Sequence, residues 1–248
     1  MSKDYEKFME DIFTCDICDK DKGAEKDYYI GNLNARIGML MQNPGIGSKL
    51  NKEKLKDSKK QFKNYEKKFE FDTNSLNNWI LSDIYYKFFE TFFKLLKSKG
   101  LISFNKFDDY IKSGDLYNDV YFFDVVKCKK NTENVSKCNL TNCPNKFLYK
   151  EFNLFNKLEF IFVFGARTWD VFKKKFPKTE LVDKDLKIKS KTVTQIHGYL
   201  YKSDIGGREL YVIPLVHMSP RIFNNLLRNS YFDYLEEGLA KYVEEKWN

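Results

Sequence analysis

The sequence contains few of the residues that mark fibrous, disordered or disulfide-rich chains. Its 12 glycines and 5 prolines make up only 17 of 248 residues, which excludes collagen-like and low-complexity architectures. Five cysteines are too few, and odd in number, for a disulfide scaffold. No apolar run approaches the ~20 residues of a membrane span, and the start of the chain lacks the layout of a secretory signal. We therefore expect an intracellular, cytoplasmic protein without a membrane partner.

Aromatic and basic residues are abundant instead. The 23 Phe, 16 Tyr and 3 Trp residues can fill a large hydrophobic core, so we expect a single globular domain over residues 1–248. Lys and Arg outnumber Asp and Glu by 43 to 35, which gives a formal net charge of +8. Such an excess suits a nucleic-acid partner, and an AT-rich genome also enriches lysine without any functional cause.

Short apolar runs alternate with helical patterns along the chain. Strands are predicted at residues 35–41, 120–126, 159–164 and 210–216. Helices are predicted at residues 5–20, 49–68, 75–98 and 147–155, directly after Gly165, and from about residue 229 onward. This order indicates an α/β fold with an open, mainly parallel four-stranded sheet flanked by helices.

Three polar segments stand at or near the ends of predicted strands. The sequence QNPG at residues 42–45 ends the first strand, Asp124 interrupts the second, and HMSPR at residues 217–221 ends the fourth. Ligands of open α/β sheets bind beyond the carboxyl ends of the strands, so we expect these segments to converge on one site. Local preferences alone also explain QNPG as a turn, because Asn-Pro and Pro-Gly favour turns.

A lysine-rich helical insertion is predicted at about residues 46–74. Nine lysines, among them Lys60 and Lys63, fall between residues 49 and 68. This pattern is typical of a solvated helix face, while its position directly after QNPG also suits a contact with DNA phosphates.

The cysteines are candidate metal ligands. Cys15 and Cys18 form a Cys-x2-Cys pair, and Cys128, Cys138 and Cys143 follow much later in the chain. Thiolates bind zinc and iron–sulfur clusters alike. The spacing by itself therefore leaves zinc, a cluster and free buried thiols open.

Several segments are similar to the motifs of one protein family. Cys18 precedes Gln42 by 24 residues, which matches the family's spacing between a Cys-x2-Cys pair and its first motif. The sequence MQNPG at residues 41–45 is similar to GEAPG in one branch and to GINPG in another. VYFFDVVKC at residues 120–128 is similar to VYITNVVKC, and HMSPR is similar to an HPS-type second motif. The chain thus resembles the uracil-DNA glycosylase superfamily, most closely its iron–sulfur (family 4-like) branch, with a divergent active site.

This resemblance implies a DNA glycosylase with a structural cofactor. The expected cofactor is a 4Fe–4S cluster, with zinc as the alternative. The implied ligands are Cys15, Cys18, Cys128 and Cys143, with Cys138 as the alternative fourth ligand. The implied partner is double-stranded DNA with one nucleotide flipped out of the helix, and the protein is expected to act as a monomer.

The resemblance also assigns roles at the strand ends. Gln42 occupies the position of the Glu in GEAPG and is expected to contact the base, so Asn43 is expected to position the attacking water. His217 is expected to donate a hydrogen bond to the carbonyl O2 of the departing base. Ser219 is expected to hold a phosphate beside the flipped nucleotide, and Arg221 to enter the vacated stack.

Asp124 stands where the family has an Asn that reads the uracil edge. An ionised carboxylate only accepts hydrogen bonds, which suits the N4 amine of cytosine and repels uracil O4, whereas a protonated carboxyl still donates. Gly45 replaces a bulky Tyr that closes off the pyrimidine C5 position, and Phe71 is the candidate for stacking on the base. The prediction is excision of a 5-substituted cytosine-type base; the alternatives are uracil removal in base excision repair and a catalytically inactive DNA-binding relative.

Overall fold

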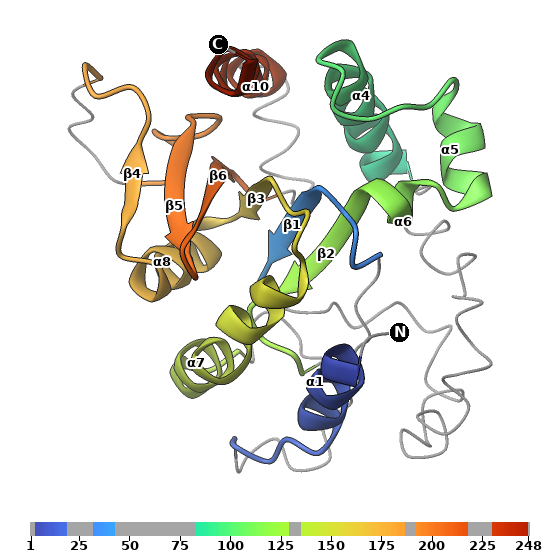
Figure 1. The fold of residues 1–248 in the computed structure, drawn as a ribbon. Coiled ribbons are helices and arrows are strands. Elements are labelled where there is room, and N and C mark those ends of the chain that lie inside the picture. Colours follow the sequence, from blue (N-terminus) through green and yellow to red (C-terminus); the bar gives the residue numbers. More distant parts are fainter. Residues whose placement is uncertain are drawn as a thin grey trace.

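The computed structural model describes residues 3–18, 32–42, 83–128, 135–186, 192–217 and 230–247. Within these ranges a sheet lies between two layers of helices (Figure 1). The strands are β1 (Ile37–Met41), β2 (Val120–Asp124), β3 (Phe160–Phe164), β4 (Thr179–Leu181), β5 (Tyr201–Ile205) and β6 (Arg208–Leu215). The helices are α1 (Lys3–Phe13), α4 (Asp83–Ser98), α5 (Phe107–Ser113), α6 (Leu116–Asp119), α7 (Lys137–Leu154), α8 (Ala166–Lys175) and α10 (Tyr231–Trp247).

The sheet has six strands in the order β2-β1-β3-β6-β5-β4. The strands β2, β1, β3 and β6 are parallel, and they are the four that the apolar runs predict, so the α/β class is confirmed. The predicted number of strands is wrong, because β5 and β4 extend the sheet by antiparallel pairing beside β6. β5 alternates buried and exposed residues instead of forming an apolar run, and Gly206 and Gly207, at φ of 67° and 80°, connect it to β6.

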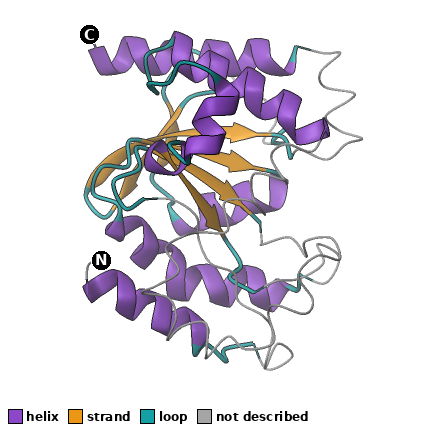
Figure 2. Cartoon of the chain, turned by 90° about the vertical axis from the view of Figure 1, so that its right-hand side faces the viewer, coloured by secondary structure: helices purple, strands orange, loops and turns teal. Residues whose placement is uncertain are grey.

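Helices cover both faces of the sheet. In Figure 2 the helices α10 and α4 lie above the strands, and α1 and α7 lie below them. α7 contacts both α1 and α8 on the lower face, whereas α10 contacts α4 on the upper face. The arrowheads of the parallel strands point to the same edge of the molecule, so this edge carries all four of their carboxyl ends.

Alternate residues of the central strands fill the two layers of the core. Phe162 of β3 faces α4, where its ring centroid lies 4.9 Å from that of Phe92. On the opposite face, Phe123 of β2 lies 4.8 Å from Phe152 of α7. A Cβ atom at Gly38 in β1 would approach the ring of Phe123 to 2.8 Å, so glycine at this position makes room for the aromatic ring.

The first helix is shorter than predicted. It ends at Phe13 rather than at residue 20, and a turn follows in which the N–H of Cys15 donates to the carbonyl of Ile12 at 3.2 Å. The Thr14 hydroxyl also donates to the carbonyl of Glu10 at 2.8 Å, which satisfies an acceptor of the last turn. The cysteines at positions 15 and 18 therefore lie in a loop instead of on a helix.

The helix α7 is longer than predicted. It begins at Lys137 rather than at residue 147, because Ser136 caps it and its hydroxyl accepts from the N–H of Asn139 at 3.2 Å. This earlier start brings Cys138 and Cys143 onto the helix. The short helices α5 and α6 were not predicted.

The lysine-rich helix predicted at residues 49–68, and with it the insertion at about 46–74, lies outside the described residues. In the part of the chain that is described, no helix combines the length and the apolar character needed to cross a bilayer.

Candidate active site at the carboxyl edge of the sheet

The carboxyl ends of β1 and β2 place Gln42 beside Asp124. The strand register pairs Met41 with Asp124, and the pairing continues as the N–H groups of Val125 and Val126 donate to the carbonyls of Met41 and Gln42, both at 2.9 Å. Paired residues of parallel strands share a face, so Asp124 belongs to the face that α4 and α10 cover. Gln42 is buried, whereas Asp124 is half-buried. The side chain of Asp124 therefore stands at the end of the strand, partly open to solvent.

His217 lies beyond the carboxyl end of β6, next to the end of β3. The N–H of Gly165 donates to the carbonyl of Leu215 at 2.8 Å, which joins the two strand ends. A Cβ atom at Gly165 would come within 3.3 Å of the Cβ of His217, and the φ of Gly165 is +90°, so only glycine suits this turn into α8.

The surroundings of His217 favour the neutral form of its imidazole. Its side chain reaches solvent, yet the surrounding protein atoms lower its pKa by desolvation. A neutral imidazole carries one N–H, so His217 can donate one hydrogen bond to a ligand at this edge.

Asp124 and His217 stand on either side of the strands β1 and β3. Three strand spacings separate β2 from β6, and at roughly 4.8 Å each they amount to about 14 Å between the backbones. The structure thus brings Gln42, Asp124 and His217 to one edge of the sheet, while their chemical roles stay predictions.

The other residues predicted for this site lie outside the described residues. They are Asn43, Gly45, Lys60, Lys63, Phe71, Ser219 and Arg221. Their predicted roles in positioning water, reading and stacking on the base, and binding phosphates therefore stay predictions.

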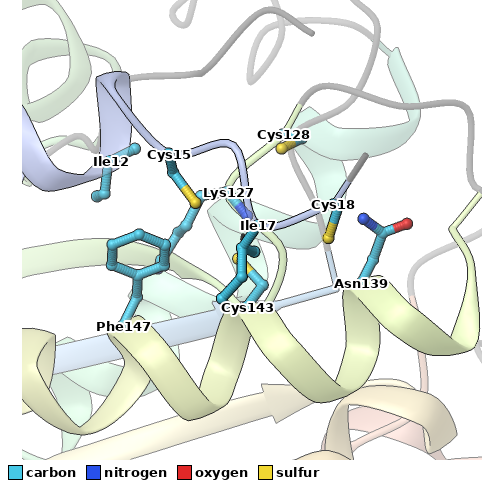
Figure 3. Close-up of a pocket in the computed structure, with 9 residues that line it drawn as sticks. All are labelled: Ile12, Cys15, Ile17, Cys18, Lys127, Cys128, Asn139, Cys143 and Phe147. Carbon is cyan, nitrogen blue, oxygen red and sulfur yellow. Dashed lines mark hydrogen bonds between the residues drawn. The ribbon is translucent and has the colours of Figure 1, made fainter. Parts of the chain in front are cut away.

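A second candidate site is a pocket lined by cysteines between α1 and α7 (Figure 3). Cys15 and Cys18 come from the loop after α1, Cys128 follows the end of β2, and Cys143 lies on α7. The lining is completed by Ile12, Ile17, Lys127, Asn139 and Phe147. Three separate segments of the chain therefore bring the four predicted metal ligands to one place.

Cys143 lines the pocket, and Cys138 does not belong to its lining. Cys143 is 6% exposed, and this burial raises the pKa of its thiol to about 12. The backbone N–H of Lys127 donates to the Sγ of Cys143 at 3.2 Å. Cys138 is exposed, with its Sγ 3.8 Å from that of Cys18.

The pocket brings sulfur donors together, and whether they hold a cluster or zinc stays a prediction. Among the described residues, no group of three or more His, Cys, Asp or Glu side chains could hold one metal ion. Zinc requires its thiolates about 2.3 Å from one centre, whereas a 4Fe–4S cluster has one iron for each thiolate and accepts thiolates that lie farther apart. The Nζ of Lys146, 3.7 Å from the Sγ of Cys15, adds a positive charge beside the sulfurs.

Lys127 and Glu151 form a buried ion pair that the sequence analysis missed. Lys127 donates through Nζ to a carboxylate oxygen of Glu151, and their side chains are 1% and 0% exposed. The same Nζ donates to the backbone carbonyl of Asp124 at 2.5 Å. Because Lys127 also donates to Cys143 through its backbone, it connects the end of β2 with both α7 and the cysteine pocket.

A signal for this pair was present in the sequence. Glu151 falls on the apolar face of α7, between Leu148 and Phe152 and four residues after Phe147. A charge on such a face indicates a buried partner, because unpaired burial is costly. Burial raises the pKa of Glu151, and the ammonium of Lys127 opposes that rise.

The two sites belong to an open, mainly parallel α/β domain with polar side chains at the carboxyl edge of its sheet. Residues 28–240 match the Uracil DNA glycosylase superfamily, and the chain therefore belongs to this superfamily. A comparison with curated proteins gives no match. Membership supports a glycosylase-type hydrolase that acts on DNA. The resemblance to the superfamily is thus confirmed, and placement in its iron–sulfur branch stays a prediction.

Proposed function

We propose that the protein is a DNA glycosylase that favours a 5-substituted cytosine-type base. It acts as a monomer on double-stranded DNA, flips one nucleotide out of the helix and hydrolyses its N-glycosidic bond. The observation that carries the proposal is the position of Asp124, which is half-buried at the end of β2 and paired in register with the last residue of β1.

Asp124 reads the edge of the base in this proposal. As a carboxylate it accepts a hydrogen bond from the N4 amine of a cytosine-type base, and it repels the O4 atom of uracil. Gly45 leaves space at C5 of the pyrimidine, which is why a substituted cytosine is favoured over an unmodified one.

His217 and Asn43 carry the hydrolysis. Cleavage of the bond leaves negative charge on the departing base, and the neutral imidazole of His217 donates its N–H to the base carbonyl O2. Asn43, the next residue in the chain after Gln42, orients the water that attacks the sugar. No strong base is required, because the sugar becomes oxocarbenium-like before water adds to it.

Detection of abasic sites in a panel of duplexes tests this function. The panel contains matched duplexes with uracil, cytosine, a 5-substituted cytosine or hypoxanthine at one position. Abasic product from the substituted cytosine at the highest rate supports the proposal, whereas fastest release of uracil supports a repair enzyme for uracil. Binding to duplexes without abasic product from any member would identify a catalytically inactive DNA-binding relative and overturn the proposal.

We further propose that Cys15, Cys18, Cys128 and Cys143 hold a structural 4Fe–4S cluster. The support is their common pocket and the N–H donor from Lys127 to the sulfur of Cys143. The bound cluster would tie the loop after α1 to α7 and to the end of β2, beside Asp124.

Iron, sulfide and zinc analysis of anaerobically purified protein tests the cluster. We expect about four irons and four sulfides per chain with a brown absorbance, and zinc in their place would contradict the proposal. Cys143→Ser is expected to lose the absorbance. Cys138→Ser tests the alternative fourth ligand on the same helix. It is expected to keep the absorbance, because Cys138 is exposed outside the pocket lining, and loss of the absorbance in Cys138→Ser but not in Cys143→Ser would make Cys138 the ligand instead.

A further inference from the structure

Two side chains from other parts of the chain hold the backbone of Val216, the residue that precedes His217. The N–H of Val216 donates to Nδ1 of His197 at 3.1 Å, and the hydroxyl of Tyr231 donates to the carbonyl of Val216 at 3.2 Å. Nε2 of His197 lies 3.0 Å from the carbonyl oxygen of Tyr231. We call this set of three residues, His197, Val216 and Tyr231, the His197 clamp.

The clamp defines the protonation state of His197. Nδ1 receives the N–H of Val216, so it carries the lone pair, and Nε2 carries the hydrogen that it donates to Tyr231. His197 is only 5% exposed, and this burial lowers the pKa of its ring. The ring is therefore neutral at pH 7 and occupies one tautomer.

Close packing holds the clamp in place between β6 and α10. Gly198, directly after His197, donates its N–H to the carbonyl of Pro214 at 2.9 Å. A Cβ atom at Gly198 would lie 2.4 Å from the carbonyl oxygen of Tyr234 in α10, and the φ of Gly198 is +81°. The backbones of three segments thus approach each other closely, which leaves His197 little freedom to shift.

We propose that His197 is a positioning residue for His217, an inference that rests on the proposed function of His217. The carbonyl of Val216 and the nitrogen of His217 belong to one planar peptide. The Tyr231 bond holds this peptide, and the His197 bond holds the preceding peptide through the N–H of Val216. Together they fix the backbone on both sides of Val216 and with it the direction in which the chain enters His217. His197 is buried and acts only through Val216, without contact to the substrate.

Two substitutions of His197 test the proposal in base-release kinetics. The amide of Gln offers an acceptor and a donor at a spacing close to that of the ring nitrogens, so His197→Gln is expected to retain most of the wild-type kcat. His197→Leu offers neither, and kcat is expected to fall about 10- to 100-fold with little change in KM, because a displacement of about 1 Å costs that much. Equal rates for the Gln and Leu variants would overturn the proposal.

A control separates positioning from general loss of stability. Thr179→Val also removes a buried hydrogen-bonding side chain, since the Thr179 hydroxyl donates to the carbonyl of Phe176 at 2.6 Å. Thr179 lies in β4, the strand at the opposite edge of the sheet from β2. Its variant is expected to keep the wild-type kcat per folded molecule, and a loss as large as that of His197→Leu would contradict the proposal.

NMR of the histidine rings provides a readout that does not require activity. The chain has only two histidines, so labelled rings give two sets of signals. We expect His197 with Nδ1 unprotonated at pH 7, and we expect the His217 ring signals to move in Tyr231→Phe, which loses the hydroxyl bond to Val216. A protonated Nδ1, or unmoved His217 signals, would overturn the inference. Absence of base release by the wild type would instead overturn the proposed function. The NMR signals would still decide whether the clamp positions His217, because this readout does not require activity.

Discussion

Removal of Lys127 is expected to destabilise the protein strongly. Lys127→Met leaves Glu151 buried without its cation, which costs about 3–5 kcal/mol of the free energy of unfolding. Chemical unfolding followed by circular dichroism measures the loss. Lys150→Met is the matched control, because its exposed pair with Asp11 (3.4 Å) contributes less than about 1 kcal/mol. Equal losses in both variants would contradict the account of the buried pair.

The pH dependence of stability is expected to show the burial of His197. The folded ring has a pKa below the ordinary value of 6.5, so below about pH 6.5 the unfolded chain binds a proton that the folded chain does not. The stabilisation is complete above that pH and is lost as the pH falls toward the folded pKa, by up to about 1.4 kcal/mol per pH unit. Free energies of unfolding at several pH values, compared with those of His197→Gln, measure this slope, and identical slopes would show that the ring is not buried neutral.

Two glycines with similar backbone angles allow the cost of a left-handed backbone to be measured apart from the cost of overpacking. Gly198 and Gly207 have nearly the same φ, 81° and 80°, but a Cβ atom meets the carbonyl of Tyr234 only at Gly198, and nothing lies within 4 Å at Gly207. Gly207→Ala is expected to cost about 1–2 kcal/mol from the left-handed backbone alone. Gly198→Ala adds overpacking of about 1–3 kcal/mol or more. Thermal unfolding compares the stability of the two variants. Equal losses of stability would mean that α10 does not pack closely against Gly198 beside the His197 clamp.

The helices were harder to predict than the parallel strands. Each parallel strand is a short apolar run because both of its faces are buried, and a run of this kind is visible in the sequence. The first turns of α7 are polar, so the predicted start fell ten residues late, and only the Ser136 capping box marks the true start at Lys137. β5 is amphipathic, and the Gly206-Gly207 pair was its only local signal.

The candidate site was predictable where it depends on strand ends and unpredictable where it depends on packing between segments. Parallel strands bring Gln42, Asp124 and His217 to one edge by topology alone. The contact of Lys127 with Glu151, and that of His197 with Val216, depend on how helices and loops dock on the sheet. The sequence indicates that Glu151 needs a buried partner, but it contains no local pattern that says which residue docks there, so these contacts were found only in the structure.

The charge of the whole chain supports its proposed partner. A net charge of +8 favours approach to the DNA backbone, and this attraction is screened by salt. Sequence-independent affinity for duplex DNA is therefore expected to fall as the salt concentration rises. Base preference, in contrast, is expected to change little with salt, because it depends on Asp124 and not on the phosphates.

The preference for one base over another tests the central claim most directly. The measurement is the ratio of release rates for a 5-substituted cytosine and for uracil in otherwise identical duplexes, taken for wild type and for Asp124→Asn. The wild type is predicted to favour the cytosine-type base, and the Asn variant to shift the ratio toward uracil by about 1–3 kcal/mol, at least about fivefold. An unchanged ratio in an active variant would contradict the claim that Asp124 reads the base.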